Sequence, residues 1–366
     1  MALAKWNVYN KFPSNEGNRQ DSAGYLIYVT PIIPLYWAGC YINAYAPDLR
    51  CWIESPGFSS NNFWTYNWIT WTTPPLSPGW RFHIPSPLES LNPVTSTSRS
   101  SWQVLDLIID SLIQINPFTH EHVLWAVKSW YPPEGYEPFI EPNVTHGMKV
   151  TLELRPGICW HDGVPVSAST IKYNLDFIKE IQPPRLSNVW KTYLRSIVQE
   201  PPNDKITIYI NGTQTGFWPI YEYLKAALLV PPHIYCPYGP VDLNQDGVVT
   251  YNEVVEFKPW QTPHPWALNM TCLIGTGPWA FKGWNDTIRL VKYEHYFARI
   301  FLREDTNFDG IVDMTDIGMV LRAFTATPSH PKWNNGQFDV NCDKKVDMTD
   351  VGMVLRKFGK ITLPCC

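Results

Sequence analysis

The clearest pattern of apolar and polar positions begins at residue 148. Polar and apolar side chains alternate through residues 148–154 with β-branched residues among them, which predicts a half-buried strand. Two turns are predicted after it, at 155–157 and at 161–163, and Gly163 is expected to supply a positive φ in the second. Ser167 then stands at an N-cap position. Apolar residues recur after it at helical spacing, which predicts an amphipathic helix: Ile171, Leu175 and Ile178.

Other segments also have patterns that predict structure. Apolar residues at helical spacing predict an amphipathic helix over 102–115, and residues 205–210 read as a strand. Residues 22–45 contain an apolar, strand-like run that is broken by two prolines. The proline-rich stretch 72–79 (TTPPLSPG) reads as a linker, so a domain seam is predicted there.

An ordered series of motifs accompanies the strand, turns and helix. The chain reads Leu154-Arg155-Pro156-Gly157, then Trp160-His161-Asp162-Gly163-Val164-Pro165, then Ser167-Ala168, and later Gly275-Thr276-Gly277-Pro278-Trp279. This order closely resembles the family 5 extracellular solute-binding proteins of peptide and oligosaccharide importers. The resemblance implies an α+β protein with the mixed-sheet lobe of a periplasmic-binding-protein-like (type II) fold.

The resemblance also implies an unusual order of the chain. Residues 1–75 resemble the C-terminal tail of the solute-binding fold, and residues 80–300 resemble its N-terminal lobe, so tail and head are exchanged. The stretch that normally forms the second lobe after the Gly-Thr-Gly-Pro turn is missing. We expect one lobe closed by both segments. Residues 1–20 lack a signal-peptide pattern, so the sequence is expected to be a fragment or to have lost its leader.

A 12-residue acidic loop opens at Asp305 and returns 34 residues later. Comparing 305–324 with 339–358, 14 of 20 positions are identical, which indicates an internal duplication. Oxygen-bearing side chains stand at loop positions 1, 3, 5, 9 and 12 and position 7 offers its carbonyl, a spacing that surrounds Ca²⁺. The ligands predicted by this spacing are Asp305, Asn307, Asp309, Ile311, Asp313 and Asp316 in the first loop, and Asp339, Asn341, Asp343, Lys345, Asp347 and Asp350 in the second.

Each of these loops is followed by a single predicted helix. A calcium loop and one helix, twice over, resemble the dockerin type I module, which would span residues 303–360. The resemblance implies that calcium folds this small all-α module and that its helices dock onto a cohesin-like partner. Lys344 stands where glycine is expected at position 6, so we expect strain in the second loop.

A third acidic loop lies within residues 240–256 and resembles an EF-hand. Its predicted ligands are Asp242, Asn244, Asp246, Val248, Thr250 and Glu253, the last of them bidentate. The alternative interpretation of all three loops is that they are solvated acidic turns. We expect structural calcium, because ordering a loop of repelling carboxylates without a cation is costly.

Composition narrows the class of protein. The net charge is −4 and no basic patch stands out, which argues against a nucleic-acid partner. The apolar runs are too short to span a bilayer. The 18 Trp, 19 Tyr and 34 Pro suit an extracellular, loop-rich protein that contacts its ligand with ring faces. Four N-x-S/T sequons agree with a surface glycoprotein: Asn143, Asn211, Asn269 and Asn285.

The eight cysteines suggest two disulfides in an oxidising compartment. Cys40 and Cys51 flank a predicted hairpin, and Cys236 and Cys272 flank an insertion, so each pair is a disulfide candidate.

The residue chemistry does not predict an enzyme. His161-Asp162 reads as part of a turn rather than as an acid–base pair, and the sequence has no nucleophile-elbow or zinc-finger spacing. Ligand contact is expected from aromatic side chains near the family's cleft, whose alternative role is core packing. These candidates are Tyr36, Trp37, Tyr45, Trp102 and Trp279.

The leading hypothesis is a calcium-stabilised, cell-surface substrate-binding component of a peptide or oligosaccharide ABC importer, which works with a membrane permease. The alternative is a structural or scaffold protein that assembles through the dockerin-like module or by self-association. An enclosed, aromatic-lined pocket would favour the first, and a large exposed apolar face would favour the second. A carbohydrase is a third hypothesis, but no arrangement of carboxylates supports a glycosidase pair.

Overall fold

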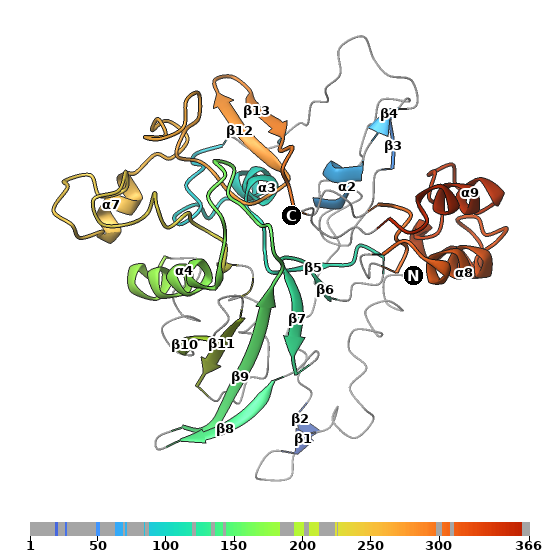
Figure 1. The fold of residues 1–366 in the computed structure, drawn as a ribbon, viewed down its shortest axis with the longest axis horizontal. Coiled ribbons are helices and arrows are strands. Elements are labelled where there is room, and N and C mark those ends of the chain that lie inside the picture. Colours follow the sequence, from blue (N-terminus) through green and yellow to red (C-terminus); the bar gives the residue numbers. More distant parts are fainter. Residues whose placement is uncertain are drawn as a thin grey trace. The chain divides into compact units, whose positions relative to one another are not determined.

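The computed structural model of the 366-residue chain is shown in Figure 1. It describes residues 19–20, 26–27, 49–51, 63–68, 70–71, 84, 88–118, 122–132, 136–141, 144–183, 194–200, 205–211, 224, 226–297, 302–307 and 311–360. The chain divides into two compact units, residues 1–44 and 45–366. The described part of the first unit is an antiparallel pair of short strands, β1 (Arg19–Gln20) and β2 (Leu26–Ile27).

The second unit is organised around a five-stranded sheet. Strand β9 (Val144–Leu154) lies at its centre and pairs with β7 (Val127–Tyr131), β8 (Glu137–Glu141) and β11 (Lys205–Ile210), and β11 pairs in turn with β10 (Leu194–Glu200). All strand pairs among the described residues are antiparallel. The strands predicted over 148–154 and 205–210 are confirmed, and the first of them begins earlier, at Val144.

One face of this sheet is apolar and the other is polar. Met148, Val150 and Leu152 of β9 are buried, and helix α4 (Ala168–Ile181) packs against β10 and β11 with its predicted apolar residues fully buried. On the polar face, the Thr151 and Thr207 hydroxyls lie 2.8 Å apart in a hydrogen bond. Ion pairs also cross the strands there. They join Lys128 to Glu153 (2.6 Å) and Lys149 to Glu137 (2.7 Å).

Helix α3 (Arg99–Ile108) is shorter than the helix predicted over 102–115. It ends because Ile109 is extended, with φ −106° and ψ 130°. The chain then forms β5 (Ile113–Ile115), which pairs with β6 (His122–Leu124). The apolar spacing continues beyond the helix because Leu112 and Ile113 are also buried in the core, so the pattern alone does not mark the boundary.

Helix α2 (Phe63–Trp68) belongs to the segment predicted to resemble the fold's tail, and it packs into the main core. The Trp64 ring is buried edge-to-face against Trp125 (centroids 5.4 Å apart), and its Nε1 donates to the Ile115 carbonyl at 2.8 Å. Strands β3 (Leu49–Arg50) and β4 (Thr70–Trp71) pair on either side of this helix in sequence. The predicted seam at 72–79 lies outside the described residues.

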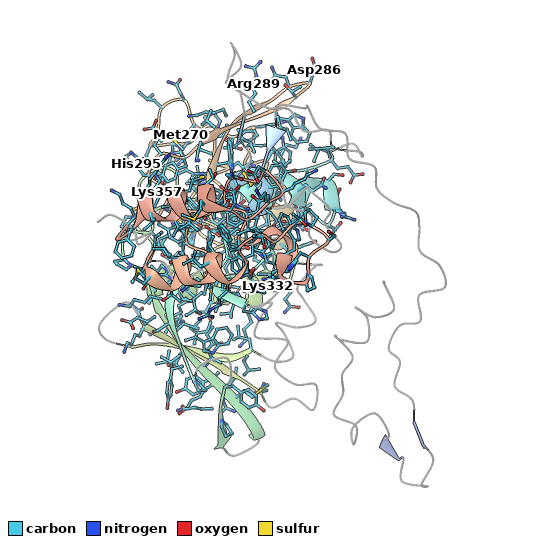
Figure 2. All side chains as sticks on the ribbon, turned by 90° about the vertical axis from the view of Figure 1, so that its right-hand side faces the viewer. Met270, Asp286, Arg289, His295, Lys332 and Lys357 are labelled. Atoms are coloured by element: carbon cyan, nitrogen blue, oxygen red, sulfur yellow. A yellow bond between two sulfur atoms is a disulfide. The ribbon has the colours of Figure 1, made fainter. Side chains whose placement is uncertain are left out.

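Two further elements follow the sheet in the chain. Helix α7 (Tyr251–Glu256) comes directly after the third acidic loop, with Thr250 as its N-cap. Strands β12 (Trp279–Trp284) and β13 (Ile288–Lys292) form an antiparallel hairpin, and Figure 2 shows Asp286 and Arg289 at its far end. Among the described residues, no helix is both long and apolar enough to traverse a bilayer.

Residues 311–360 form a small helical module with its own apolar core. It contains α8 (Met314–Arg322), the 3-10 helix η1 (Pro331–Gly336) and α9 (Met348–Lys357). Val312 exchanges backbone hydrogen bonds with Gly359 and Lys360, and Val346 does the same with Thr325 and Ala326. These two sets of hydrogen bonds are related by the 34-residue repeat. Each repeat of the module therefore bonds to the other repeat in the same way.

Candidate metal centres

The first and last residues of each acidic loop are carboxylates that the fold buries. All six have exposed fractions between 0% and 7%: Asp242, Glu253, Asp305, Asp316, Asp339 and Asp350. Burying an ionised carboxylate is costly unless a cation or strong hydrogen bonds compensate. Placing two of them in one 12-residue loop adds repulsion to that cost. The fold therefore concentrates buried negative charge where the sequence predicts calcium.

The last carboxylate of each loop accepts the same backbone hydrogen bonds. Glu253 accepts from Asn244 N (3.3 Å) and Thr250 N (2.9 Å). Asp350 accepts from the equivalent positions 3 and 9, at 3.1 and 2.7 Å, and Asp316 does so at 3.2 and 2.8 Å. These bonds orient each carboxylate toward the interior of its loop, so the three loops share one architecture.

The backbone of the loops supports the same conclusion. Among the described loop residues, position 4 lies in the left-handed region at Gln245 (φ 59°) and at Cys342 (φ 60°). Position 6 does too, at Gly247 (φ 83°) and Lys344 (φ 73°), and its N–H donates to the first carboxylate of its loop at 2.9 and 2.8 Å. The expected strain at Lys344 is thus visible as a positive φ in a residue that carries a Cβ.

The donor sets of the loops fit a calcium ion. The Oδ1 atom of Asp242 is buried and has no hydrogen-bond partner, so this carboxylate oxygen has lost its water without gaining a donor. Burial raises the pKa of Asp339 to about 6, and burial also raises the pKa of Asp350. Burial alone would raise the pKa of Asp242 too, but the N–H groups of Tyr238 and Gly247 hold it below its ordinary value. A divalent cation would favour the ionised form in every loop.

The other predicted ligands have varied surroundings. Asp313 and Asp347 cap α8 and α9 through Thr315 N (2.6 Å) and Thr349 N (2.7 Å), which fits position 9, where contact with calcium often runs through water. Thr250 Oγ1 donates to Glu253 at 2.7 Å. Asp309 lies outside the described residues. The remaining predicted ligands lie on the described parts of the loops: Asn244, Asp246, Val248, Asn307, Ile311, Asn341, Asp343 and Lys345.

The motif turns that the sequence singles out interlock. His161 N donates to Gly275 O at 2.9 Å, and the buried His161 ring accepts from Gly275 N at Nδ1 (3.2 Å) and contacts Gly277 O through Nε2 (2.9 Å). With Nδ1 as acceptor, the neutral ring donates from Nε2. Burial lowers the pKa of His161 to about 4, which keeps it neutral near pH 7. His161 therefore joins two turns that are more than a hundred residues apart, and the prediction of a structural turn residue is consistent with this placement.

The end of α3 closes against the second of these turns. Gly277 N donates to Ile108 O at 2.8 Å. A Cβ on Gly275 would lie 2.0 Å from Ile108 O, and a Cβ on Gly277 would lie 2.6 Å from Leu107 O. Only glycine permits this approach of backbone to backbone. The two turns and the helix end thus form one packed unit, here called the turn lock (His161, Gly275, Gly277 and Ile108).

A family match covers the five-stranded sheet and three of the four residues of the turn lock, His161, Gly275 and Gly277. Residues 123–314, more than half of the chain, match the model described as bacterial extracellular solute-binding proteins, family 5 Middle. The chain belongs to this family of solute-binding proteins. Residues 303–359 of the same solute-binding protein match the dockerin type I domain, which agrees with the duplicated loop and helix. Both resemblances stated from the sequence are confirmed.

Solved structures that resemble part of this chain include oligopeptide-binding proteins with a bound peptide or sugar. An oligopeptide-binding protein from Thermus thermophilus with a pentapeptide has 14% identity and a TM-score of 0.43, covering 56% of this chain and 35% of its own. AppA from Bacillus subtilis with a nonapeptide has 17% identity and a TM-score of 0.41 (58% and 36%). An oligopeptide-binding protein from Thermotoga maritima with mannohexaose has 20% identity and a TM-score of 0.39 (58% and 32%). The chain spans about a third of these proteins, and no curated protein matches it.

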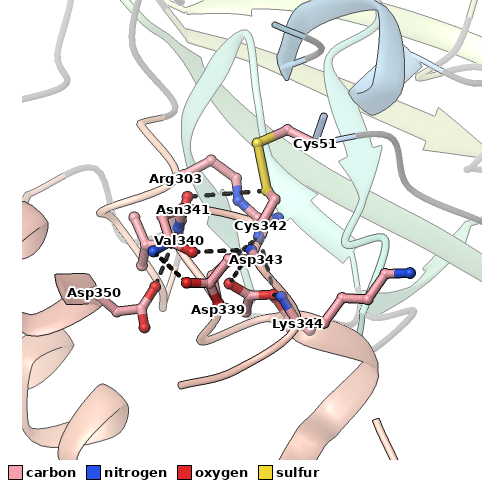
Figure 3. The surroundings of a disulfide bond; sticks show 10 residues. Cys51, Arg303, Asp339, Val340, Asn341, Cys342, Asp343, Lys344 and Asp350 are labelled. Carbon is pink, nitrogen blue, oxygen red and sulfur yellow. Dashed lines mark hydrogen bonds between the residues drawn. A yellow bond between two sulfur atoms is a disulfide. The ribbon is translucent and has the colours of Figure 1, made fainter. Parts of the chain in front are cut away.

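A disulfide in the solute-binding protein joins Cys51 to Cys342, 291 residues apart, with Cα atoms 5.3 Å apart (Figure 3). This corrects the expected pairing of Cys51 with Cys40, which lies outside the described residues. Strand β3 ends at Arg50, directly before Cys51, and it pairs with β4. The strand next to Cys51 is therefore paired with a later segment of the chain and not with the expected hairpin. Cys342 is position 4 of the second dockerin loop, so the bond ties that loop to the segment before α2.

The expected disulfide between Cys236 and Cys272 is also wrong, since both are free cysteines. The Cys236 thiol donates to His233 O (3.6 Å) and the Cys272 thiol donates to Pro263 O (3.4 Å). The chain between them folds as the acidic loop and α7 rather than as a hairpin that would bring the two sulfurs together.

Arg303 connects the dockerin-like module to the core. Its guanidinium lies over the rings of Trp68 (5.2 Å) and Phe118 (5.5 Å). The same group donates to Gly336 O at 3.1 Å and to Asp339 O (Figure 3). Burial lowers the pKa of Arg303 to about 10, and the group stays charged at pH 7. Cation–π contact and the disulfide together attach the second acidic loop of the module to the core.

Of the aromatic residues expected to contact ligand, two lie in the described residues. Trp102 on α3 is packed against the core, and its Nε1 donates to Ser96 O at 2.7 Å. Trp279 opens β12 and is partly buried. Tyr36, Trp37 and Tyr45 lie outside the described residues.

Sequence reasoning missed a cluster around Asp162. Its Oδ2 atom lies 2.7 Å from His233 Nε2 and 3.1 Å from His264 Nε2. The two histidines are 31 positions apart in sequence, a spacing that indicates no site, and their one shared signal is a proline on the N-terminal side of each. Burial opposes ionisation of Asp162, but hydrogen bonds from His233 and Val164 N hold its pKa below the ordinary value.

Proposed function

We propose that this solute-binding protein is a calcium-stabilised, cell-surface component of a peptide or oligosaccharide importer. It would capture solute for a membrane permease. The observation that carries this proposal is the turn lock, which joins the two family motifs within the matched residues 123–314. The family's own description as extracellular supports the location. We propose binding rather than catalysis, in keeping with a family of binding proteins.

We propose that residues 1–75 act as the tail of the fold, residues 80–300 as its N-terminal lobe and residues 303–360 as the dockerin-like module. The burial of Trp64 against Trp125 supports the first part of this division, because α2 adds its rings to the lobe's core. Ligand contact through Trp102 and Trp279 remains part of the proposal.

Calcium is proposed at all three loops, with a structural role. The six buried carboxylates and the partnerless Oδ1 of Asp242 support it. A loop that brings such groups together without a cation would hold them at a large electrostatic cost. Bound calcium would stabilise the loop that opens at Asp242 and the dockerin-like module outside the cell, where calcium is plentiful.

A cohesin-like partner is proposed for the dockerin-like module. Large apolar side chains are exposed at equivalent positions of the two repeats, a pattern expected of a surface that another protein covers. They are Met314, Leu321 and Phe324 in the first repeat and Met348, Leu355 and Phe358 in the second.

Calorimetry on the calcium-loaded protein tests the importer proposal. Titration with pooled peptides of defined length and with manno- and gluco-oligosaccharides is expected to give saturable heat for one of the two classes. A matched titration with Gly318→Ala on α8, where an added Cβ meets nothing within 4 Å, should give the same heat. A folded protein that produces no heat with either class contradicts the proposal.

The exposed apolar residues of the module also favour the second candidate, a scaffold protein that assembles through this surface. Light scattering after size exclusion separates the candidates. Under the scaffold function, the protein self-associates or forms a complex with a cohesin, and Met314→Ser with Met348→Ser weakens that association without altering solute binding. A monomer that ignores both partners removes the second candidate.

A further inference from the structure

Asp162, His233 and His264 direct three metal-binding atoms toward one point. The Asp162 Oδ2 atom and the two Nε2 atoms all lie within 4.8 Å of one another. Asp162 is held in place because its Oδ1 atom accepts from Val164 N at 3.1 Å, which leaves Oδ2 for the imidazoles. The side chains of Asp162 and His264 are 4% and 1% exposed, and that of His233 is 21% exposed. Two of the three side chains are thus buried, and solvent can reach the cluster beside the third, His233.

The three residues come from separate parts of the chain. Asp162 lies in the turn that carries the turn lock, His233 follows two prolines, and His264 lies beside the isolated bridge between Pro263 and Thr271. The Trp266 ring lies 6.1 Å from the His233 ring and 5.8 Å from the His264 ring, measured between centroids. The fold therefore converges on this cluster and places one exposed aromatic side chain beside it.

We propose that Asp162, His233 and His264 bind a divalent first-row transition-metal ion such as Zn²⁺, with a fourth position open to water or to a ligand atom. Two neutral imidazoles and one carboxylate are a donor set that suits these borderline ions, whereas Ca²⁺ prefers oxygen alone. With metal–ligand distances of about 2.0–2.1 Å, a tetrahedral ion sets its ligand atoms roughly 3.3 Å apart. The contacts of 2.7 and 3.1 Å would therefore widen by about 0.6 and about 0.2 Å.

Metal binding would replace the hydrogen bonds from the two imidazole Nε2 atoms to Asp162, and it would also change a third hydrogen bond. His264 Nδ1 now accepts from Trp266 N at 3.2 Å. A metal on Nε2 leaves the imidazole proton on Nδ1, so this contact opens and the N–H turns to another acceptor. The adjustment would fall on the segment at Trp266. This residue is 68% exposed, so the surrounding structure leaves it room to move. The alternative is a metal-free arrangement in which both imidazoles donate to Asp162, and the two arrangements differ in measurable ways.

Cobalt substitution tests the site directly. The tag-free protein, kept in excess Ca²⁺ so that the acidic loops are filled, is titrated with Co²⁺, and visible absorption reports tetrahedral coordination. We expect one equivalent of Co²⁺ with intense d–d bands and its displacement by Zn²⁺. His233→Gln and Asp162→Asn are each expected to weaken binding by about tenfold or more. His233 is partly exposed, so this variant is expected to fold, and circular dichroism checks that it does.

The matched control is His295→Gln, an exposed histidine outside the cluster that is labelled in Figure 2. It should bind Co²⁺ as the unchanged protein does. The proposal is overturned if the folded protein shows no tetrahedral cobalt spectrum even at about 100 μM Co²⁺. It is equally overturned if His233→Gln and Asp162→Asn bind as tightly as His295→Gln. Neither outcome bears on solute capture, which the proposed function covers separately.

Discussion

Lys344 is the residue at which the duplicated module departs from ideal loop chemistry. It holds φ at 73° where the loop at Asp242 has Gly247 at 83°. In this left-handed backbone region, a residue with a Cβ is less stable than glycine by about 1 kcal/mol or more. Replacing it by glycine recovers only part of this energy, because glycine has more conformational freedom in the unfolded chain. We expect Lys344→Gly to raise the free energy of unfolding of the calcium-loaded protein by about 0.5–1 kcal/mol, measured by chemical denaturation.

Lys345→Gly is the control for that variant, because Lys345 is not among the described residues with positive φ. It removes the same side chain one position later, together with an ion pair to Asp347 (3.5 Å). It should give no stabilisation. Equal effects from the two variants would show that side-chain charge, rather than backbone conformation, governs the loop.

Asp110 is a buried acid in the core and predicts a pH dependence. Its Oδ2 atom accepts from Trp125 Nε1 (3.0 Å) and from the Tyr296 hydroxyl, and burial raises its pKa from 3.8 to about 6. The folded chain therefore holds a proton that the unfolded chain loses between these values. The stability from this group is fully present below pH 4 and is lost as the pH rises through about 6.

The corresponding measurement compares the protein with Asp110→Asn in urea at several pH values. The difference in free energy of unfolding, unchanged protein minus variant, should fall by about 2 kcal/mol between pH 4 and pH 6.5. Taking the difference cancels the opposing contribution of His161, whose pKa is lowered by burial. A difference that stays constant across this range would contradict the buried, protonated state of Asp110.

At the scale of elements, the turn lock makes the strongest prediction. Gly275→Ala would place a Cβ 2.0 Å from Ile108 O, so the turn and the end of α3 must separate. We expect a loss of about 3 kcal/mol or more in the free energy of unfolding. Gly318→Ala on α8 meets nothing within 4 Å and should be neutral or stabilising by up to about 1 kcal/mol. Similar losses in both variants would count against the interlocked turns.

Elements with local chemical signals could be predicted from the sequence. Gly163 has φ 90° as expected, and Ser167 N donates to Thr170 Oγ1 (3.2 Å) at the start of α4. The end of α3 could not be predicted, because Leu112 and Ile113 continue the apolar spacing in a strand. The acidic loops were recognised because calcium chemistry fixes the spacing of their ligands, whereas His233 and His264 meet only through the tertiary fold.

At the scale of the whole molecule, the disulfide between Cys51 and Cys342 links distant parts of the sequence. No local pattern could have predicted it, because the two cysteines are 291 residues apart. Cys51→Ser is expected to lower the free energy of unfolding by about 3–5 kcal/mol, since a long closed loop restricts the unfolded chain strongly. Cys236→Ser, which removes a free thiol, is the control. Peptide mapping that links Cys51 to another cysteine would contradict the assignment.

Calcium is the feature on which the account of the whole molecule depends, because three loops bury six carboxylates. The most direct test is the free energy of unfolding in saturating Ca²⁺ compared with that in a chelator. Each occupied loop is expected to add about 3 kcal/mol at a hundredfold excess over its Kd, and Asp350→Asn should remove the share of one loop. Unfolding that is the same with and without Ca²⁺ would contradict the account.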